Sequence, residues 1–229
     1  MSRSIDSVNW FFVPYDQLNH DIFPWADSNR GNNGLIFIES SKKGNSKNFH
    51  KQKLALLLSN MRHFSKEAES LGHPIIYKST TLGYSEVLED LYEQLGSIKV
   101  VKPAERELRI ELESLLSNGK VQFLEHSGWL TKRSWFLESV GDKPPFRMDR
   151  FYQRVRKETG ILMEQGKPTG GKYSFDSENR FPWKGDPAAQ IELEYGVDEI
   201  DQKVMDLVNE KFSSHPGQCD LSKVPTTLE

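Results

Sequence analysis

Apolar residues in the first part of the chain follow two different spacings. Leu35–Ile38 form an unbroken apolar run, which is typical of a strand covered on both faces, as in a parallel sheet. Between Leu54 and Leu71 apolar residues recur at helical spacing, and Gly72 stands where a helix cap belongs. The pattern therefore predicts a buried strand, a polar loop over Glu39–Phe49 and a long amphipathic helix.

Strands and helices continue to alternate up to about residue 128. Further helices are expected over Tyr84–Leu95 and from Pro103 to the turn at Asn118-Gly119. Further strands are expected at Val8–Val13, His73–Lys78, Ser97–Val101 and Val121–Leu124. Because such alternation is the signature of right-handed βαβ units, we expect an α/β fold. Residues 1–128 would form a Rossmann-like, doubly wound, five-stranded parallel sheet, and residues 129–229 a helical and loop extension.

The extension carries weaker apolar patterns. They predict helices at Leu130–Val140, Met148–Met163 and Val197–Phe212, with a linker before the last helix and a polar tail after it. The middle helix presents four arginines that we expect to point largely outward: Arg147, Arg150, Arg154 and Arg156. This basic face is either solvated, with partners such as Glu158 for Arg154, or a contact for DNA phosphates or a partner protein.

Composition narrows the possible functions. The formal net charge of −3 gives no sign that the whole chain binds nucleic acid, but residues 131–172 carry ten basic and five acidic side chains. A single cysteine, Cys219, excludes an internal disulfide, a cysteine-based zinc site and a four-thiolate cluster. The chain has no secretory signature and no long apolar segment, so we expect a soluble, cytoplasmic protein that makes no membrane contact.

The predicted sheet places the first candidate site. Ligands of open α/β sheets bind at the carboxyl ends of the strands, where the strand order reverses. We therefore expect a crevice beside Asp16, Glu39 and the turn Lys102-Pro103-Ala104. No glycine fingerprint follows the first strand and no Walker A sequence is present, so an ordinary dinucleotide or nucleoside triphosphate site is not expected.

Three motifs are distinctive enough to suggest a family. Asp16-Gln17-Leu18 follows the first strand, and the long helix contains His50, Lys53 and Arg62 within HKQK and MRHF. The third, GILMEQGKPTGGKYSFDSENR, contains the paired glycines and a polar group: Gly170, Gly171, Asp176, Glu178, Asn179 and Arg180. Together they resemble the photolyase-related proteins, the iron–sulfur branch of bacterial photolyases and cryptochromes. The resemblance extends from about Trp10 to Phe212.

This resemblance implies that the full-length protein has two domains with different roles. The N-terminal α/β domain of the family can hold an antenna chromophore, 6,7-dimethyl-8-ribityllumazine or another pteridine-like ring. FAD, the 4Fe-4S cluster and most of the DNA-repair site belong to a C-terminal domain that this chain lacks. We therefore expect an antenna-type domain of a light-driven DNA-repair protein, either a fragment or a stand-alone homologue, that is not catalytic alone. DNA would be bound only in the full-length context.

Two alternatives remain. In the first, the chain is an interaction subunit without its own chromophore that docks on a separately encoded flavin and iron–sulfur half. The second alternative is a hydrolase or transferase on the same sheet, but the sequence supplies no catalytic triad or carboxylate pair for it.

The resemblance assigns chromophore-binding roles to Asp16, Glu39, Lys43, Leu57 and Ala104. Lys43 departs from the family, because the corresponding residue is acidic and a lysine cannot accept a hydrogen bond from a ring N–H. Either the chromophore differs, or Glu39 substitutes, or the pocket is empty. The other motif residues are expected to be structural, with Arg147, Arg150 and Arg154 available to phosphate or a partner. No metal site is expected, since His50 and His63 lie too far apart on one helix.

Overall fold

The computed structural model describes residues 8–21, 23–26, 30–176, 182–191 and 193–227, and these divide into two compact units. The first unit comprises Met1–Ser127 together with Glu192–Glu229, and the second comprises Gly128–Ile191. No helix within the described ranges is both long and apolar enough to cross a membrane.

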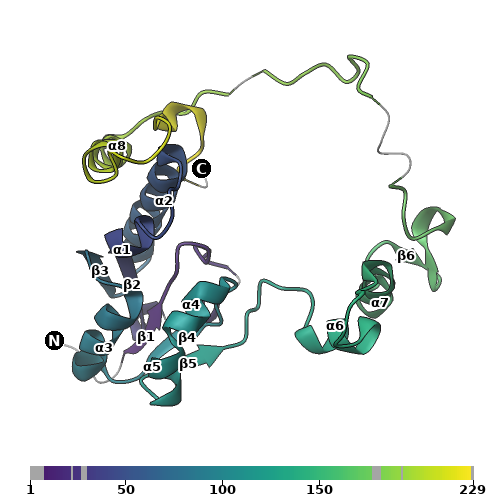
Figure 1. Cartoon of the computed structure of the whole chain (residues 1–229), viewed down its shortest axis with the longest axis horizontal. Helices are drawn as coiled ribbons and strands as arrows, with labels where there is room; N and C mark the ends of the chain where they lie inside the picture. Colours follow the sequence, from purple (N-terminus) through teal and green to yellow (C-terminus); the bar gives the residue numbers. More distant parts are fainter. Residues whose placement is uncertain (1–7, 22, 27–29, 177–181, 192, 228–229) are drawn as a thin grey trace. The chain divides into compact units, whose positions relative to one another are not determined.

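The first unit is built on a five-stranded parallel sheet, which confirms the predicted fold class (Figure 1). The strand order is β3-β2-β1-β4-β5, so the order reverses between β1 and β4. A crevice at the carboxyl ends of these two strands is therefore expected from the topology. The strands are β1 (Asn9–Phe12), β2 (Asn33–Ser40), β3 (Ile75–Thr80), β4 (Ile98–Val101) and β5 (Val121–Leu124).

Helices cover both faces of this sheet. On one face α3 (Tyr84–Leu95), α4 (Arg106–Glu111) and α5 (Glu113–Ser117) pack on the strands through apolar side chains that include Leu88, Leu108 and Leu115. The other face is covered by α2 (Lys51–Ser70) and by the segment before β2, which contributes Phe23 and Trp25. That segment contains two short 3₁₀ helices, η2 (Pro24–Ala26) and η3 (Arg30–Asn32).

The C-terminal segment packs on α2 and belongs to the first unit. Helix α8 (Glu199–Lys211) contacts α2, and both Val204 and Val208 are buried with Leu54 and Ala55. The expected polar tail also docks here, since η6 (Leu221–Lys223) buries Leu221 completely. The sequence grouped residues 129–229 as one extension, whereas the structure places the part from 192 onward with the sheet. Burial of apolar side chains between α2 and α8 explains this difference.

Two predicted segments differ in detail from the structure. The loop over Glu39–Phe49 is not all loop, because β2 extends to Ser40 and is followed by the short helix α1 (Ser41–Gly44). The helix expected from Pro103 begins only at Arg106, after Glu105, and it is interrupted at Leu112 between α4 and α5. Leu112 is fully buried, so the chain bends around a core contact rather than at an exposed turn.

The second unit contains two helices and a small hairpin. These are α6 (Arg133–Val140), α7 (Met148–Thr159), the two-residue strands β6 (Met163–Glu164) and β7 (Lys167–Pro168), and η4 (Thr169–Gly171). Helix α7 ends earlier than predicted, because Gly160 adopts the left-handed conformation that caps it. The expectation that Arg156 points outward is wrong. Its side chain is buried and donates to the carbonyls of Ile161, Leu162 and Tyr173.

Candidate functional site

A cavity of about 200 Å³ lies at the carboxyl ends of the strands in the first unit. Its wall is mainly apolar on the side of α2 and α8, and its rim is charged on the side of α1. Three of the five predicted chromophore residues line it, namely Glu39, Lys43 and Leu57, and Lys53 lines it as well. The apolar wall comprises Leu54, Leu57, Leu58, Met61 and Phe212, and the polar rim comprises Tyr15, Lys43, Lys47, Lys53 and Glu105.

Glu39 is held in place by its own protein partners. Its carboxylate accepts hydrogen bonds from Arg62 through Nε at 2.7 Å and Nη2 at 2.9 Å, and the Tyr77 hydroxyl donates to the same carboxylate. The hydrogen bond to Glu39 raises the pKa of Arg62, although burial opposes this shift. A buried charge of this kind must remain paired. Most of the acceptor capacity of Glu39 is therefore used, and little is left for a ring N–H of a ligand.

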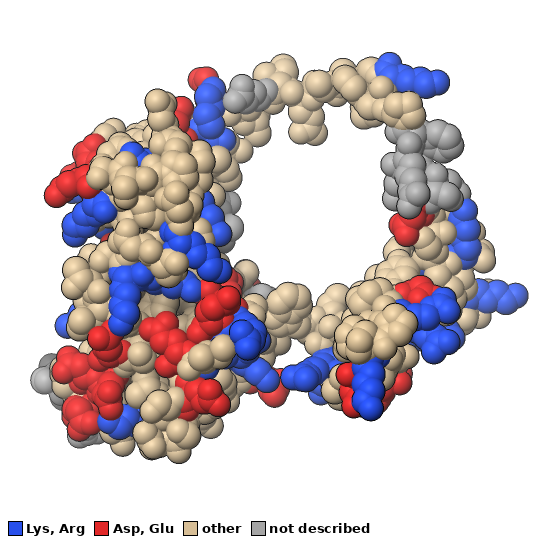
Figure 2. Space-filling view, in the orientation of Figure 1, with Lys and Arg blue, Asp and Glu red and all other residues tan. Residues whose placement is uncertain are grey.

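Lys43 bridges the crevice. Its ammonium forms an ion pair with Glu105, and the Tyr15 hydroxyl donates to the other oxygen of that carboxylate at 3.2 Å. Burial raises the pKa of Tyr15, and the charge of Glu105 adds to this shift. The bridge joins the helix after β2 to the residue that precedes α4. Figure 2 shows the setting, where basic and acidic side chains face one another over the region between α1 and α4.

Asp16 and Ala104 lie beside the cavity rather than in its lining. Partial burial raises the pKa of Asp16, and the charge of Glu105 adds to it, against a hydrogen bond from the backbone of Asp16 itself. Ala104 precedes α4, and its carbonyl accepts from Arg109 Nη1 at 2.6 Å. Ala104 therefore does not lie at a helix start, although the helix was expected from Pro103, because α4 begins at Arg106.

The neighbour of Asp16 in its motif has a clear structural role. Gln17 is almost fully buried, and its amide nitrogen donates to the carbonyl of Val101, the last residue of β4, at 3.0 Å. This bond ties the turn after β1 to β4 at the point where the strand order reverses. The sequence indicated the motif but not this contact, because the pairing of β1 with β4 is visible only in the fold.

His50 and Lys53 organise the start of α2. The His50 ring caps the helix by accepting from the Gln52 amide at 3.1 Å, and the ammonium of Lys53 lies 5.0 Å from the Phe49 ring centroid. The tail packs directly on this cap, since a Cβ added to Gly217 would come within 1.9 Å of His50 Nε2. Both motif residues therefore support the wall of the cavity that α2 provides.

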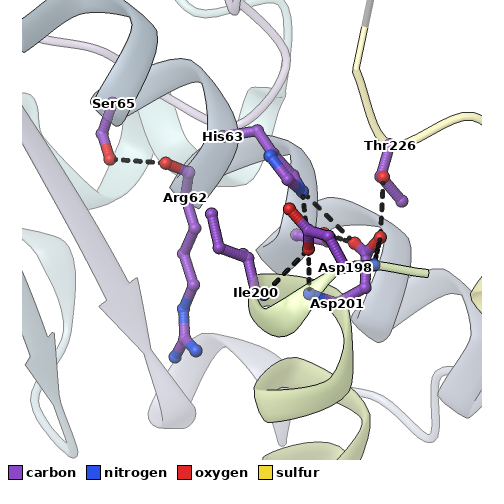
Figure 3. Close-up of polar contacts among 8 residues, drawn as sticks. Arg62, His63, Ser65, Asp198, Ile200, Asp201 and Thr226 are labelled. Carbon is purple, nitrogen blue, oxygen red and sulfur yellow. Dashed lines mark hydrogen bonds and ion pairs between the residues drawn. The ribbon is translucent and has the colours of Figure 1, made fainter. Parts of the chain in front are cut away.

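A second polar cluster joins α2 to α8 (Figure 3). His63 Nε2 lies 3.3 Å from an Asp201 oxygen and 3.6 Å from an Asp198 oxygen. Asp201 also accepts from Ser59 and from Thr226, whose hydroxyl lies 3.1 Å away. Burial alone would raise the pKa of Asp201, but these hydrogen bonds together lower it.

The ligand atoms of this cluster lie close enough together to hold a metal ion. Its hydrogen bonds, however, account for the positions of the side chains without a metal. Ligand atoms of His63, Asp198 and Asp201 lie within 4.8 Å of one another. However, Asp198 caps α8 by accepting from the amides of Ile200 at 2.8 Å and Asp201 at 2.9 Å. We interpret the cluster as a helix cap and an interhelical contact, and we assign no metal to it.

The remaining predicted residues lie in the second unit. Arg147 is paired with Asp149 at 2.7 Å, Arg154 with Glu138 at 2.6 Å, and Arg150 is exposed. Gly170 and Gly171 both have positive φ, at +75° and +80°. Asp176 is exposed beside Ser174, whereas Glu178, Asn179 and Arg180 lie outside the described residues. Two of the three predicted contact arginines thus already have acidic partners.

Comparison with known proteins adds information that the geometry does not contain. Residues 11–223 match the family model described as deoxyribodipyrimidine photo-lyase-related protein. A protein named (6-4) photolyase from Agrobacterium fabrum is 26% identical over 216 residues, which cover 90% of this chain and 42% of that protein. An uncharacterized protein, R852, of Acanthamoeba polyphaga mimivirus is 28% identical over 177 residues, which cover 74% of this chain and 86% of that protein. The chain thus spans less than half the length of the photolyase it matches.

Proposed function

The chain belongs to the deoxyribodipyrimidine photo-lyase-related protein family, and from this premise we propose that its first unit is an antenna-type, chromophore-binding domain. The ligand we propose is 6,7-dimethyl-8-ribityllumazine or another pteridine-like ring. The observation that carries the proposal is the cavity at the carboxyl ends of the strands, with its apolar wall and two tyrosines, Tyr15 and Tyr84. A slot of this kind suits a flat aromatic ring with polar edges.

The proposed role of the chain is to absorb light for another domain. In the longer context the chromophore would pass its excitation energy to FAD, and light-driven repair of DNA lesions would occur in a domain that also holds a 4Fe-4S cluster. The matched (6-4) photolyase supports this proposal through its name and its greater length. No residue of this chain is proposed to catalyse repair.

Binding of the ring can be tested directly. We expect the purified chain to retain the visible absorption of 6,7-dimethyl-8-ribityllumazine after desalting. Leu57→Trp fills the cavity and should abolish retention, whereas Leu116→Trp, on the exposed side of α5, should leave it intact. Retention that survives Leu57→Trp, or no retention by the unsubstituted chain, would contradict the proposed site.

A second role is favoured by the surface of the second unit. Its described residues expose many large apolar side chains: Leu130, Phe146, Met148, Tyr152, Ile161, Leu162, Trp183 and Ile191. Monomeric proteins seldom leave so many apolar groups uncovered in a small region. The occupant we propose is the flavin and iron–sulfur domain, in the same or a separate chain.

Docking is measurable by light scattering. The chain would be mixed with the part of the Agrobacterium (6-4) photolyase that it does not match, and a one-to-one complex is expected. Tyr152→Ser with Leu162→Ser should weaken the complex, whereas a pair on the first unit, Leu82→Ser with Ile110→Ser, should not. Equal weakening by both pairs, or no complex, would count against this role.

A further inference from the structure

Three lysines from successive elements line the same cavity. Lys43 lies in α1, Lys47 in the loop that follows, and Lys53 in the first turn of α2. Lys43 is neutralised by the part-buried carboxylate of Glu105. The other two ammonium groups have weaker partners, which leaves positive charge at the mouth of the cavity.

The partner of Lys47 is Glu107, at 3.9 Å, and both side chains are more than half exposed. Exposed ion pairs at such a distance contribute little to stability, because solvent screens them. Lys53 rests its ammonium over the Phe49 ring, 5.0 Å from the centroid. Neither contact fixes the ammonium against a stronger anion.

The start of α2 strengthens this positive field. A helix N-terminus carries a partial positive charge, and acidic side chains usually stand near it. The first turn of α2 instead contains Lys51 and Lys53 and no acidic residue. A negative group bound beside Lys53 would reverse this unfavourable arrangement.

The cavity is large enough for the ring of a ligand but not for the ring together with its substituent. At about 200 Å³ it is smaller than most complete ligand pockets, which measure roughly 300–1,000 Å³. Its apolar depth, formed by Leu57, Leu58 and Met61, accommodates a ring. The rest of a ligand would extend outward past Lys47 and Lys53. A neutral polyhydroxyl chain could accept hydrogen bonds from these two lysines but would leave their charge uncompensated.

We propose that the ligand of this crevice carries an anionic group, a phosphate or a carboxylate, on the substituent of its ring, and that Lys47 and Lys53 bind this group. The inference rests on the proposed function and specifies its ligand. Lysine suits the role because it presents three donors and a compact charge to an oxyanion.

The test compares ligands that differ only in charge. Fluorescence titrations would use 6,7-dimethyl-8-ribityllumazine against its 5′-phosphate, and 6-methylpterin against 6-carboxypterin. At low salt we expect the anionic member of at least one pair to bind about tenfold more tightly, and added salt to reduce the difference. The pair that shows the preference identifies phosphate or carboxylate as the bound group.

The lysines are tested with a matched control. The double variant Lys47→Gln with Lys53→Gln should abolish the preference for the anionic ligand. Lys42→Gln should retain it, because the Lys42 ammonium is paired with Glu86 at 2.8 Å and does not line the cavity. Equal affinity within both pairs overturns the anionic ligand while leaving the antenna proposal standing. Failure of all four compounds to bind overturns the antenna proposal as well.

Discussion

The two units of this protein are stabilised in different ways. The first buries three clusters of apolar side chains, on both faces of the sheet and between α2 and α8. Among the described residues of the second unit, Arg156 is the only one that is buried. Because ordering a chain costs conformational entropy, a unit without buried apolar side chains lacks the main term that offsets this cost. Within its described residues, the second unit is therefore held mainly by polar contacts and half-buried rings.

Arg62 in the first unit and Arg156 in the second each donate several hydrogen bonds, but to different partners. Arg62 pairs with a buried carboxylate, Glu39, whereas Arg156 donates to backbone carbonyls and faces the rings of Tyr152 and Tyr173. Arg62 neutralises the charge of Glu39 beside an apolar core. Arg156 instead joins the backbone carbonyls of three residues through its hydrogen bonds, in a unit whose described residues bury no apolar side chain.

The largest expected effect comes from removing a buried ring of the first unit, and a half-buried ring of the second unit serves as the comparison. Phe37 is fully buried in β2, so Phe37→Ala should lower the free energy of unfolding by about 3–5 kcal/mol. Phe151→Ala removes a half-buried ring that contacts Phe136, and it should leave the main unfolding transition unchanged. Urea denaturation followed by circular dichroism would measure both. Equal losses would show that the units share one cooperative core.

Substitution of Arg62 should destabilise the whole first unit, whereas substitution of Arg156 should affect only the second unit. Arg62→Met leaves the Glu39 carboxylate buried without its cation, so a loss of about 3 kcal/mol in the main transition is expected. Arg156→Met removes the donors for the carbonyls of Ile161, Leu162 and Tyr173. Hydrogen exchange should then accelerate within the second unit alone.

A matched substitution makes the second result specific. Arg150→Met, at an exposed position on the same helix, should leave the exchange rates unchanged. If it produces the same acceleration as Arg156→Met, the buried cation does not organise the second unit.

A smaller effect is expected where α8 joins the first unit. Asp201→Asn removes the charged acceptor of Ser59 and Thr226 and should cost about 1–2 kcal/mol at neutral pH. The folded protein lowers the pKa of Asp201 below its ordinary value of 3.8. Its contribution is therefore complete above the unfolded pKa and is lost as the pH falls through the folded pKa.

The wild-type advantage over Asp201→Asn should consequently shrink below about pH 4. Unfolding free energies measured from pH 7 to pH 3 would reveal this convergence. Asp206→Asn, at an exposed position on the same helix, should show no such dependence. A constant difference across the range would mean that the Asp201 charge is not responsible.

The smallest effects are expected in the glycine pair of the second unit. Gly171→Ala introduces a side chain at a φ of +80° with open space around it, and should cost about 1 kcal/mol. Gly170→Ala adds a Cβ that lies 2.7 Å from the Phe175 ring and should cost more. Limited proteolysis within the second unit would rank the two, and the main transition of the first unit should stay in place. A reversed ranking would contradict the contact with Phe175.

The central strand β2 was predictable because Leu35–Ile38 form an unbroken apolar run, and the other strands followed from their alternation with helices. The strand pattern placed Glu39 at the crevice, since parallel strands end at one edge, whereas Lys43 and Leu57 were assigned through the family resemblance; all three line the cavity. The bridge from Lys43 to Glu105 was missed because it joins residues 62 positions apart, across two strands whose order the sequence does not state.

Two other features had weaker signals. Packing of α8 and the tail on α2 depends on three apolar residues, Val204, Val208 and Leu221, which stand among polar neighbours. The four-residue spacing of Val204 and Val208 indicated the buried face of α8, but Leu221 had no such pattern. Burial of Arg156 could not be read from its helix, where four arginines appear equivalent. Arg156 differs from the other three because it donates to backbone carbonyls of the segment that follows the helix. Every residue has a backbone carbonyl, so the sequence does not indicate which ones an arginine will contact.

The return of the chain to α2 makes the second unit an insertion within the first. Residues 128–191 therefore form a loop whose two ends are anchored in one folded body. The entropy of closing such a loop grows only with the logarithm of its length, by about 0.6 kcal/mol for each doubling. Lengthening or shortening this segment should thus hardly affect the stability of the sheet. Changes in the length of this segment outside α6 and α7 are therefore expected to cost the sheet little stability.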